Sequence, residues 1–243
     1  MRIRLGLATA LLFLSGHPQE IALARAFPEF EPSGLQVHSE TEHWPHHLGD
    51  AQRRGAVKFG PKPPLKLQWL HQEDSAPQPG WDRPANQSYW QGLNHLQARV
   101  QFDHVFAPVI SDGKLYFGSS ADGGVRCLET ESGQLLWTFF AEAPVRLSPS
   151  LSNGRVYFGA DDGFVYCLQG SSGQLLWRTL LPPSDRRIPS NGKLLSAWPV
   201  RTGTVVDGQT LYATCGIFPN YGCWAAALDA ENGSVIWKQK LAD

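Results

Sequence analysis

The sequence predicts an all-β protein, a β-propeller built from four-stranded blades. A repeated string, a constant repeat period and the turn chemistry predict it. The string SGQLLW occurs at residues 132–137 and 172–177, and a looser copy, NGSVIW, occurs at 232–237. Trp137 and Trp177 lie 40 positions apart. A period of roughly 40 to 45 residues without helical periodicity is typical of propellers, in which each repeat forms one blade.

The composition agrees with this fold class. The chain has 243 residues, with 24 glycines, 18 prolines and a single methionine, and its formal net charge is −1. Short strands joined by many turns use glycine and proline at the turns. The nearly balanced charge gives no reason to expect nucleic acid or an acidic membrane surface as a partner.

Residues 1–24 have the features of a secretory signal peptide. Arg2 and Arg4 precede an apolar run at 5–14, and Ala-Leu-Ala at 22–24 is a small-x-small cleavage signal. The run has about ten residues, fewer than the roughly 20 that a spanning helix needs, so we expect no stable membrane span. The sequence therefore predicts a periplasmic or secreted protein, with a linker at 25–40.

Each repeat predicts the same order of four strands. A short strand of small residues ends in a turn at 112–113, 153–154 or 207–208, where glycine accepts the positive φ that such turns require. Two more strands follow, and a second turn then leads into the fourth. The glycines of that second turn are Gly133, Gly173 and Gly233, and the fourth strands carry Trp137, Trp177 and Trp237. We expect blades at 107–140, 148–180 and 199–240.

The repeated tryptophans are interpreted as structural. A blade can bury its faces only against its neighbours, and a large flat side chain at one repeated position suits the layer between blades. Stacking of a ligand on these rings is the alternative. The sequence therefore predicts that Trp137, Trp177 and Trp237, with the turn glycines, dock one blade on the next.

The tryptophan segments also carry a family resemblance. Residues 127–137, 167–177 and 227–237 resemble the repeat of the pyrroloquinoline quinone (PQQ) propeller family, whose blades interlock through this segment. Upstream, residues 44–55 resemble the usual opening of such propellers, which implies an opening segment and a lone outer strand within 41–72. Family rings have several blades, so three clear blades and an N-terminal strand predict an incomplete ring. The rest would come from missing C-terminal sequence or, alternatively, from oligomerisation.

Two segments break the repeat. Residues 73–106 are rich in proline, tryptophan and polar residues, and residues 181–198 separate the second blade from the third. Both are predicted to be loop insertions, and functional loops of propellers lie on such faces.

Two arginines could form a ligand site. Arg146 and Arg201 align just before the first strands of two successive blades. That strand lines the central axis of a propeller, so both guanidinium groups would point to one end of the channel and could bind a small anionic ligand. The alternative is that each arginine pairs with a neighbouring acid.

The cysteines and histidines give weaker signals. Cys215 and Cys223 flank an insertion and could close it as a disulfide in an oxidising compartment. Cys127 and Cys167 occupy equivalent positions and are expected to be small buried apolar side chains. No metal site is predicted: the three histidines of the HxxHH group at 43–47 are interpreted as part of a solvated loop. The acids at 161–162 are read as turn chemistry.

The resemblance implies two functions of different class. Quinoproteins of the family hold PQQ with calcium on the axis and oxidise alcohols or sugars, whereas other members resemble the outer-membrane assembly lipoprotein, a scaffold without quinone. No catalytic residue can be assigned, and whether the chain is an enzyme stays open. We expect an exported binding or scaffold module for a protein partner or an anionic ligand. The alternative is the N-terminal part of a PQQ-dependent dehydrogenase.

Overall fold

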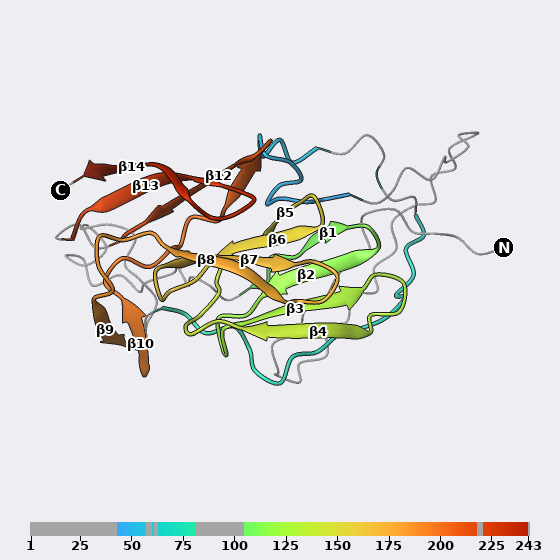
Figure 1. Cartoon of the computed structure of the whole chain (residues 1–243). Coiled ribbons are helices and arrows are strands. Elements are labelled where there is room, and N and C mark those ends of the chain that lie inside the picture. The colour runs from blue at the N-terminus through green and yellow to red at the C-terminus, as the bar shows by residue number, and fades with distance from the viewer. Residues whose placement is uncertain (1–42, 57–59, 61–62, 81–104, 218–220, 243) are drawn as a thin grey trace, which may run out of the picture.

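Figure 1 shows the computed structural model, which describes residues 43–56, 60, 63–80, 105–217 and 221–242. The predicted signal peptide and linker lie outside these residues, as does most of the first insertion. Within them the chain forms strands and turns, and no helix in this part is long and apolar enough to cross a membrane.

The strands form three consecutive four-stranded antiparallel sheets, each ordered as in the sequence. Blade 1 contains β1 (Val109–Ser111), β2 (Lys114–Gly118), β3 (Gly124–Glu129) and β4 (Leu135–Phe140). Blade 2 contains β5 (Ser150–Ser152), β6 (Arg155–Gly159), β7 (Phe164–Gln169) and β8 (Leu175–Leu180). Blade 3 contains β11 (Val205–Asp207), β12 (Thr210–Cys215), β13 (Cys223–Asp229) and β14 (Val235–Ala242). The predicted fold class is confirmed, and the described residues do not close a ring.

The second insertion contains a hairpin of its own. Strands β9 (Arg187–Ser190) and β10 (Lys193–Ser196) pair only with each other in the described structure, and they stand apart from the three blades (Figure 1). Asn191 and Gly192 at its tip have φ of 46° and 72°, which is the conformation of a two-residue hairpin turn with positive φ at both positions. The insertion is therefore an ordered element and not an irregular loop.

Turn chemistry and register repeat from blade to blade. Asp112 and Gly113 have φ of 52° and 70°, and Asn153 and Gly154 have φ of 50° and 69°, so the same type of tight turn joins the first two strands of blades 1 and 2. The ladder to the outer strand shifts register after Cys127, Cys167 and Ala227, which are equivalent positions. The repeat thus fixes backbone geometry as well as strand order.

The core lies between the blades. Between blades 1 and 2 it contains Val109, Cys127, Val156 and Phe158, all at most 1% exposed. Between blades 2 and 3 it contains Cys167, Leu211 and Leu228, each fully buried. The expectation that Cys127 and Cys167 are small buried side chains is confirmed, and burial raises the pKa of both thiols to about 12.

One contact recurs at each blade boundary. The indole Nε1 of Trp137 donates to Gly170 O at 3.0 Å, and the phenol of Tyr116 donates to the same oxygen at 3.3 Å. Trp177 and Tyr157 likewise donate to Ala230 O at 3.3 and 3.1 Å. The rings of Trp137 and Trp177 lie so close to Gly173 and Gly233 that an added Cβ would stand 2.6 and 2.5 Å from them. We call this contact the docking slot; it consists of a tyrosine and a tryptophan on one blade, and a carbonyl and a glycine on the next.

The segment before blade 1 makes a version of the same contact. Trp69 Nε1 donates to Thr130 O at 2.9 Å, and its ring lies against Gly133. Gln68 adds a bond from its amide to Glu131 O at 2.6 Å. Residues 63–70 form no strand, so the lone outer strand expected here is not formed. The contacts observed here join side chains to a turn of blade 1.

The opening segment crosses the inner strands of all three blades. Trp44 and Ile110 exchange two backbone bonds of 2.7 and 2.9 Å, Leu151 N donates to Pro45 O at 2.8 Å, and Val206 N donates to His46 Nε2 at 3.3 Å. Ile110, Leu151 and Val206 are equivalent residues of β1, β5 and β11. Residues 44–46, which we call the inner-strand brace, thus bind one blade each.

Candidate functional site

Arg146 and Arg201 lie together in the structure, as the alignment of the repeats predicts, and they meet on a carboxylate of the same chain. Asp161, in the turn between β6 and β7, accepts from Arg146 Nε at 2.6 Å and from Arg201 Nε and Nη2 at 2.7 and 2.8 Å. The carboxylate is about 1% exposed, and the two arginine side chains are 4% and 10% exposed. The alternative that each arginine pairs with an acid therefore describes the observed contacts.

The backbone places this carboxylate between the links that precede two blades. Asp161 N donates to Pro144 O at 2.9 Å, in the link before β5, and Ser196 N donates to Asp161 O at 2.7 Å, at the end of β10. Both links carry their arginine a few residues later. Because the turn is fixed on either side by backbone bonds, the side chain of Asp161 is directed at both guanidinium groups.

Residues 71–80, which we call the strap, lie over this cluster. Arg146 Nη1 donates to Gln78 O at 2.6 Å, and Gln78 N donates to Ser120 Oγ at 2.8 Å. At Gly80 an added Cβ would stand 2.6 Å from Arg201 Nη1. The strap therefore contacts both arginines. At Gly80 it lies so close to Arg201 that any larger residue would displace the guanidinium group.

The hairpin β9–β10 is fastened to the same cluster. Asn191 Nδ2 donates to Pro79 O at 2.9 Å, and Ser190 Oγ donates to Gly80 O at 3.3 Å. Lys193 Nζ donates to the carbonyls of Ser120 and Ala121. Burial, and then the charge of Arg146, lowers the pKa of Lys193. We use the name loop face for the strap, the β6–β7 turn, the hairpin and the links 141–149 and 197–204.

A second ion-pair group holds the start of the strap. Glu73 Oε2 accepts from Arg126 Nη2 at 2.9 Å, and Glu73 Oε1 lies 2.7 Å from His71 Nε2. Arg126 also bonds Asp122. Burial disfavours the charged form of Asp122, but bonds from Arg126, Gly124 N and Ser119 outweigh it and hold its pKa at about 2. Asp122 is thus ionised and anchors Arg126 under the strap.

The donor set of the loop face does not fit PQQ with calcium. The two arginines that could bind a tricarboxylate are engaged by Asp161 and, for Arg146, by a strap carbonyl. In the part of the chain that the structure describes, no three His, Cys, Asp or Glu side chains are grouped as metal ligands.

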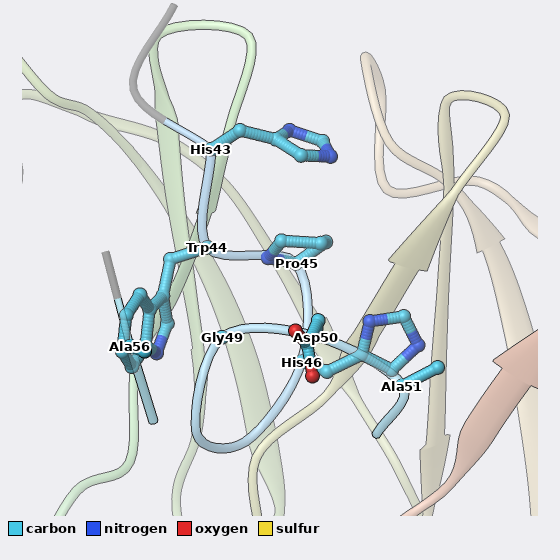
Figure 2. A pocket seen from close by; sticks show the side chains of 8 residues that line it. All are labelled: His43, Trp44, Pro45, His46, Gly49, Asp50, Ala51 and Ala56. Atoms are coloured by element: carbon cyan, nitrogen blue, oxygen red, sulfur yellow. The ribbon is translucent and has the colours of Figure 1, made fainter. Parts of the chain in front are cut away.

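A cavity of about 370 Å³ lies beside the inner-strand brace, lined by residues of the opening segment (Figure 2). His43 Nδ1 lies 3.1 Å from Ser111 Oγ. His46 is 7% exposed, and its Nδ1 has no hydrogen-bond partner among the described residues. The interpretation of this histidine group as a solvated loop is wrong for His46, because that side chain is buried against β11. It holds for His47, which is exposed.

The predicted disulfide is not formed in the structure. All four cysteines are free thiols. Cys215 lies opposite Trp224 in the ladder, and the thiol of Cys223 donates to Gly216 O at 3.4 Å. Pairing of Cys215 with Cys223 under oxidising conditions stays a prediction.

Sequence reasoning missed the two residues that organise these contacts. The sequence predicts turn chemistry at Asp161, but the turn role belongs to its neighbour Asp162, which accepts from Phe164 N as Asp122 accepts from Gly124 N. The equivalent of Asp161 in blade 1 is Ala121. This difference between Asp161 and Ala121, in repeats that otherwise match, was the signal in the sequence that Asp161 has a role of its own. The sequence predicts a strand at Trp69, and the spacing from Trp69 to blade 1 does not indicate the contact of its ring with the Thr130–Gly133 turn.

Comparisons with known proteins agree with the repeat. A family model described as outer membrane protein assembly factor BamB matches residues 73–243. None of the curated proteins compared with the chain matches it.

Similar solved structures include two dehydrogenases and one BamB. Quinohemoprotein alcohol dehydrogenase ADHIIG from Pseudomonas putida HK5 is 21% identical with a TM-score of 0.46, over 55% of this chain and 20% of that one. The quinohemoprotein alcohol dehydrogenase from Comamonas testosteroni is 23% identical with a TM-score of 0.46, over 55% of this chain and 20% of that one. BamB from Moraxella catarrhalis is 17% identical with a TM-score of 0.43, over 56% of this chain and 37% of that one.

The matched part of this chain thus spans 20% to 37% of the length of these structures. The match extends over all three blades, which lie within residues 73–243. The resemblance to PQQ-like repeats is confirmed, and the chain belongs to the family described as outer membrane protein assembly factor BamB.

Proposed function

We propose that the chain is an exported scaffold whose loop face binds a protein partner. The observation that carries this proposal is the hairpin β9–β10, which has no counterpart between blades 1 and 2 and is held in place by bonds to the strap and to the β6–β7 turn. A rigid projecting element presents contact groups at low entropic cost on binding. The family match to an assembly factor supports a role in binding proteins.

The hairpin exposes apolar groups at its outer surface. Leu194 is 59% exposed, and it lies opposite Pro189, which is also exposed, in the ladder. Two apolar side chains on one face of a short hairpin form a small patch surrounded by polar groups, which is the composition of a contact centre in many protein interfaces. The partner would therefore contact the hairpin and the adjoining strap.

Photo-crosslinking in the living host tests this proposal. A benzophenone amino acid replaces Leu194 in one strain and Leu135 in a control strain; Leu135 is 47% exposed on the outer strand of blade 1. We expect one discrete protein adduct from position 194 and none from position 135. The adduct should disappear when Pro189 is also changed to Asp, because a charge would then enter the patch. Equal adducts from both positions, or none from 194, would contradict a partner at the hairpin.

The alternative, the N-terminal part of a PQQ-dependent dehydrogenase, gives a different outcome. Titration of the full chain with PQQ and calcium by calorimetry, followed by dye reduction with alcohols and aldoses, measures it directly. We expect no saturable heat, because Asp161 already engages both arginines. Saturable quinone binding that is lost in Arg201→Gln would overturn the scaffold assignment. Binding of a small anion by Arg146 and Arg201 is a prediction that the same titration, with citrate as probe, decides.

Export is part of the proposal and rests on residues 1–24. Amino-terminal sequencing of the protein recovered from its host should give a chain that begins close after Ala24. A protein that retains Met1 and stays in the cytoplasm would contradict export.

A further inference from the structure

The inner-strand brace binds the three blades through different chemical groups. At blades 1 and 2 the brace offers backbone carbonyls, from Trp44 and Pro45, to the inner strands. At blade 3 it offers a side chain, because Val206 N donates to Nε2 of His46 at 3.3 Å. Two of the contacts are therefore insensitive to pH, and one depends on a titratable ring.

The contact with blade 3 fixes the protonation state of His46. The donor is a backbone N–H, so Nε2 must carry a lone pair, and a neutral ring then has its proton on Nδ1. A doubly protonated ring would direct an N–H at the N–H of Val206. The residue is 7% exposed, so only water from the adjoining cavity could take the place of the lost partner. Only the neutral ring is compatible with the brace as it stands.

Charged groups of both signs face this ring. Within the opening segment these are Asp50, Arg53 and His43. Across the groove of about 430 Å³ that His46 shares with blades 1 and 2 stand Asp112, in the β1–β2 turn, and Arg155, on β6. Asp207 follows Val206 on β11 and is exposed. Figure 2 shows the His43 and His46 rings on the same side of the segment, with Pro45 between them, so the rings do not form a pair.

We propose that His46 makes the inner-strand brace a pH-sensitive latch: the neutral ring holds blade 3, and protonation turns its acceptor into a donor and releases Val206. The contacts of Trp44 and Pro45 with blades 1 and 2 persist, since no titratable group takes part in them. Acid therefore loosens one blade from the opening segment and leaves the other two attached.

The direction of the pH effect follows from burial. Burial is the largest cause that lowers the pKa of His46 below its ordinary value of 6.5, and Arg53 and His43 act in the same direction, while the backbone contact with Val206 and the charge of Asp50 oppose them. The released state takes up a proton more readily than the latched state, so opening becomes more favourable as the pH falls. The change begins near pH 6.5 and ends below the lowered pKa of His46. Within that window opening rises by up to about tenfold for each pH unit.

Two measurements on the full chain test the latch. Long-range ¹⁵N–¹H correlation at pH 7.5 reports the tautomer of His46, and we expect a proton on Nδ1. Amide hydrogen exchange at pH 7.5 and pH 5 reports the latch itself. After correction for the intrinsic exchange rate, protection of the Val206 amide should fall at pH 5 by up to about tenfold per unit of pH within the window. Protection of the Ile110 amide should stay constant.

Matched variants separate the latch from a general acid effect. His46→Gln keeps a neutral acceptor and should abolish the pH dependence at Val206, whereas His47→Gln, at the exposed neighbouring residue, should leave it unchanged. The proposal is overturned if His46 carries its proton on Nε2, if Val206 is equally protected at both pH values, or if the pH dependence persists in His46→Gln. The tautomer measurement uses the unaltered protein, so it decides the matter even if a variant fails to fold.

Discussion

Asp161 combines complete burial with three hydrogen bonds from two guanidinium groups, at distances of 2.6 to 2.8 Å. Removing one partner of a buried ion pair is costly because the remaining charge stays in a medium that solvates it poorly. Here one carboxylate serves two arginines, and Arg146 is also bonded to the strap through Gln78 O. The loop face should therefore depend on this residue more than on any exposed ion pair.

Replacing Asp161 with Ala should lower the free energy of unfolding by about 3 to 5 kcal/mol, because two guanidinium groups lose their shared carboxylate. The measurement is urea denaturation followed by circular dichroism. Asp185→Ala is the matched control: Asp185 bonds Arg187 but its side chain is half exposed, and such pairs contribute about 1 kcal/mol or less. Equal losses in the two variants would show that the Asp161 cluster does not stabilise the fold.

The four thiols should differ sharply in reactivity. Cys127, Cys167 and Cys215 are buried, and burial raises the pKa of each to about 12, so almost none of the reactive thiolate forms at pH 8. Cys223 is only half-buried. Iodoacetamide at pH 8 should therefore modify Cys223 in the native protein and the other three only after unfolding, as mass spectrometry of tryptic peptides would show. Modification of Cys127 at the same rate as Cys223 would contradict this assignment.

For single residues, the sequence predicted where side chains lie better than it predicted which groups they contact. The aligned repeats correctly placed Arg146 and Arg201 together, since equivalent positions of successive blades meet near the inner strands. They could not show that Asp161 fills the space between them, because that contact joins two links to a turn and has no equivalent in blade 1. Burial of His46 was unpredictable for a similar reason, as it depends on a strand that lies 160 residues further along the chain.

Among the elements, the docking slot is the recurring unit. The turn glycine of a slot has a positive φ and contacts the tryptophan ring. Gly173, for example, has φ 72° and lies against the indole of Trp137. Gly154, in the same blade, has φ 69° with no atom within 4 Å of an added Cβ. The two glycines share a backbone requirement and differ in the contact, so they form a natural pair for comparison.

Gly154→Ala should cost about 1 to 2 kcal/mol of stability, the strain of a left-handed backbone in a residue with a Cβ. Gly173→Ala should cost a further 1 to 3 kcal/mol, because its methyl group would stand 2.6 Å from the indole of Trp137 and force the two blades apart. Thermal unfolding of both variants measures the difference. Identical losses would mean that the indole contact adds nothing and that Trp137 is not a docking residue.

The strand order, the tight turns and the three blades were predictable because short sequence patterns that repeat determine them. These patterns are the alternation within strands, an Asx-Gly or similar turn, and a strand that carries a tryptophan. The hairpin β9–β10 was expected only as an insertion. Its strands are short, and its order depends on bonds from Asn191 and Lys193 to distant backbone atoms. Periodicity carries no information about contacts of that kind.

Across the whole molecule, the blades form a row whose two ends differ. At one end Trp69 covers the Thr130–Gly133 turn of blade 1. At the other end Tyr212 and Trp237 are 41% and 44% exposed, whereas Tyr116 and Tyr157, the equivalents of Tyr212, are 5% and 2% exposed. The tyrosine and tryptophan rings of blade 3 nevertheless keep the spacing of the inner slots, with centroids 6.4 Å apart against 5.9 and 6.0 Å. The donors of a docking slot are thus already arranged on the outer face of blade 3.

Trp69→Ala should make the protein associate head to tail. The variant uncovers the blade 1 turn, and Tyr212 and Trp237 of a second copy could then direct two donors at Thr130 O, as Tyr116 and Trp137 do at Gly170 O. Sedimentation velocity should show a weight-average coefficient that rises with concentration for Trp69→Ala. The double variant Trp69→Ala with Trp237→Ala, which lacks the indole donor, should behave as the parent chain does. Association that persists in the double variant would place the contact elsewhere.

The docking slot also restricts the symmetry of any assembly that uses it. Its donors lie only on the trailing face of a blade, and its carbonyl and glycine lie on the leading face of the next. A two-fold axis would bring donors against donors, so an isologous dimer cannot form through this contact. Only heterologous addition is compatible with it, and such addition ends either in a closed ring or in an open filament. By covering the carbonyl and glycine of blade 1, Trp69 blocks such addition between copies of this chain.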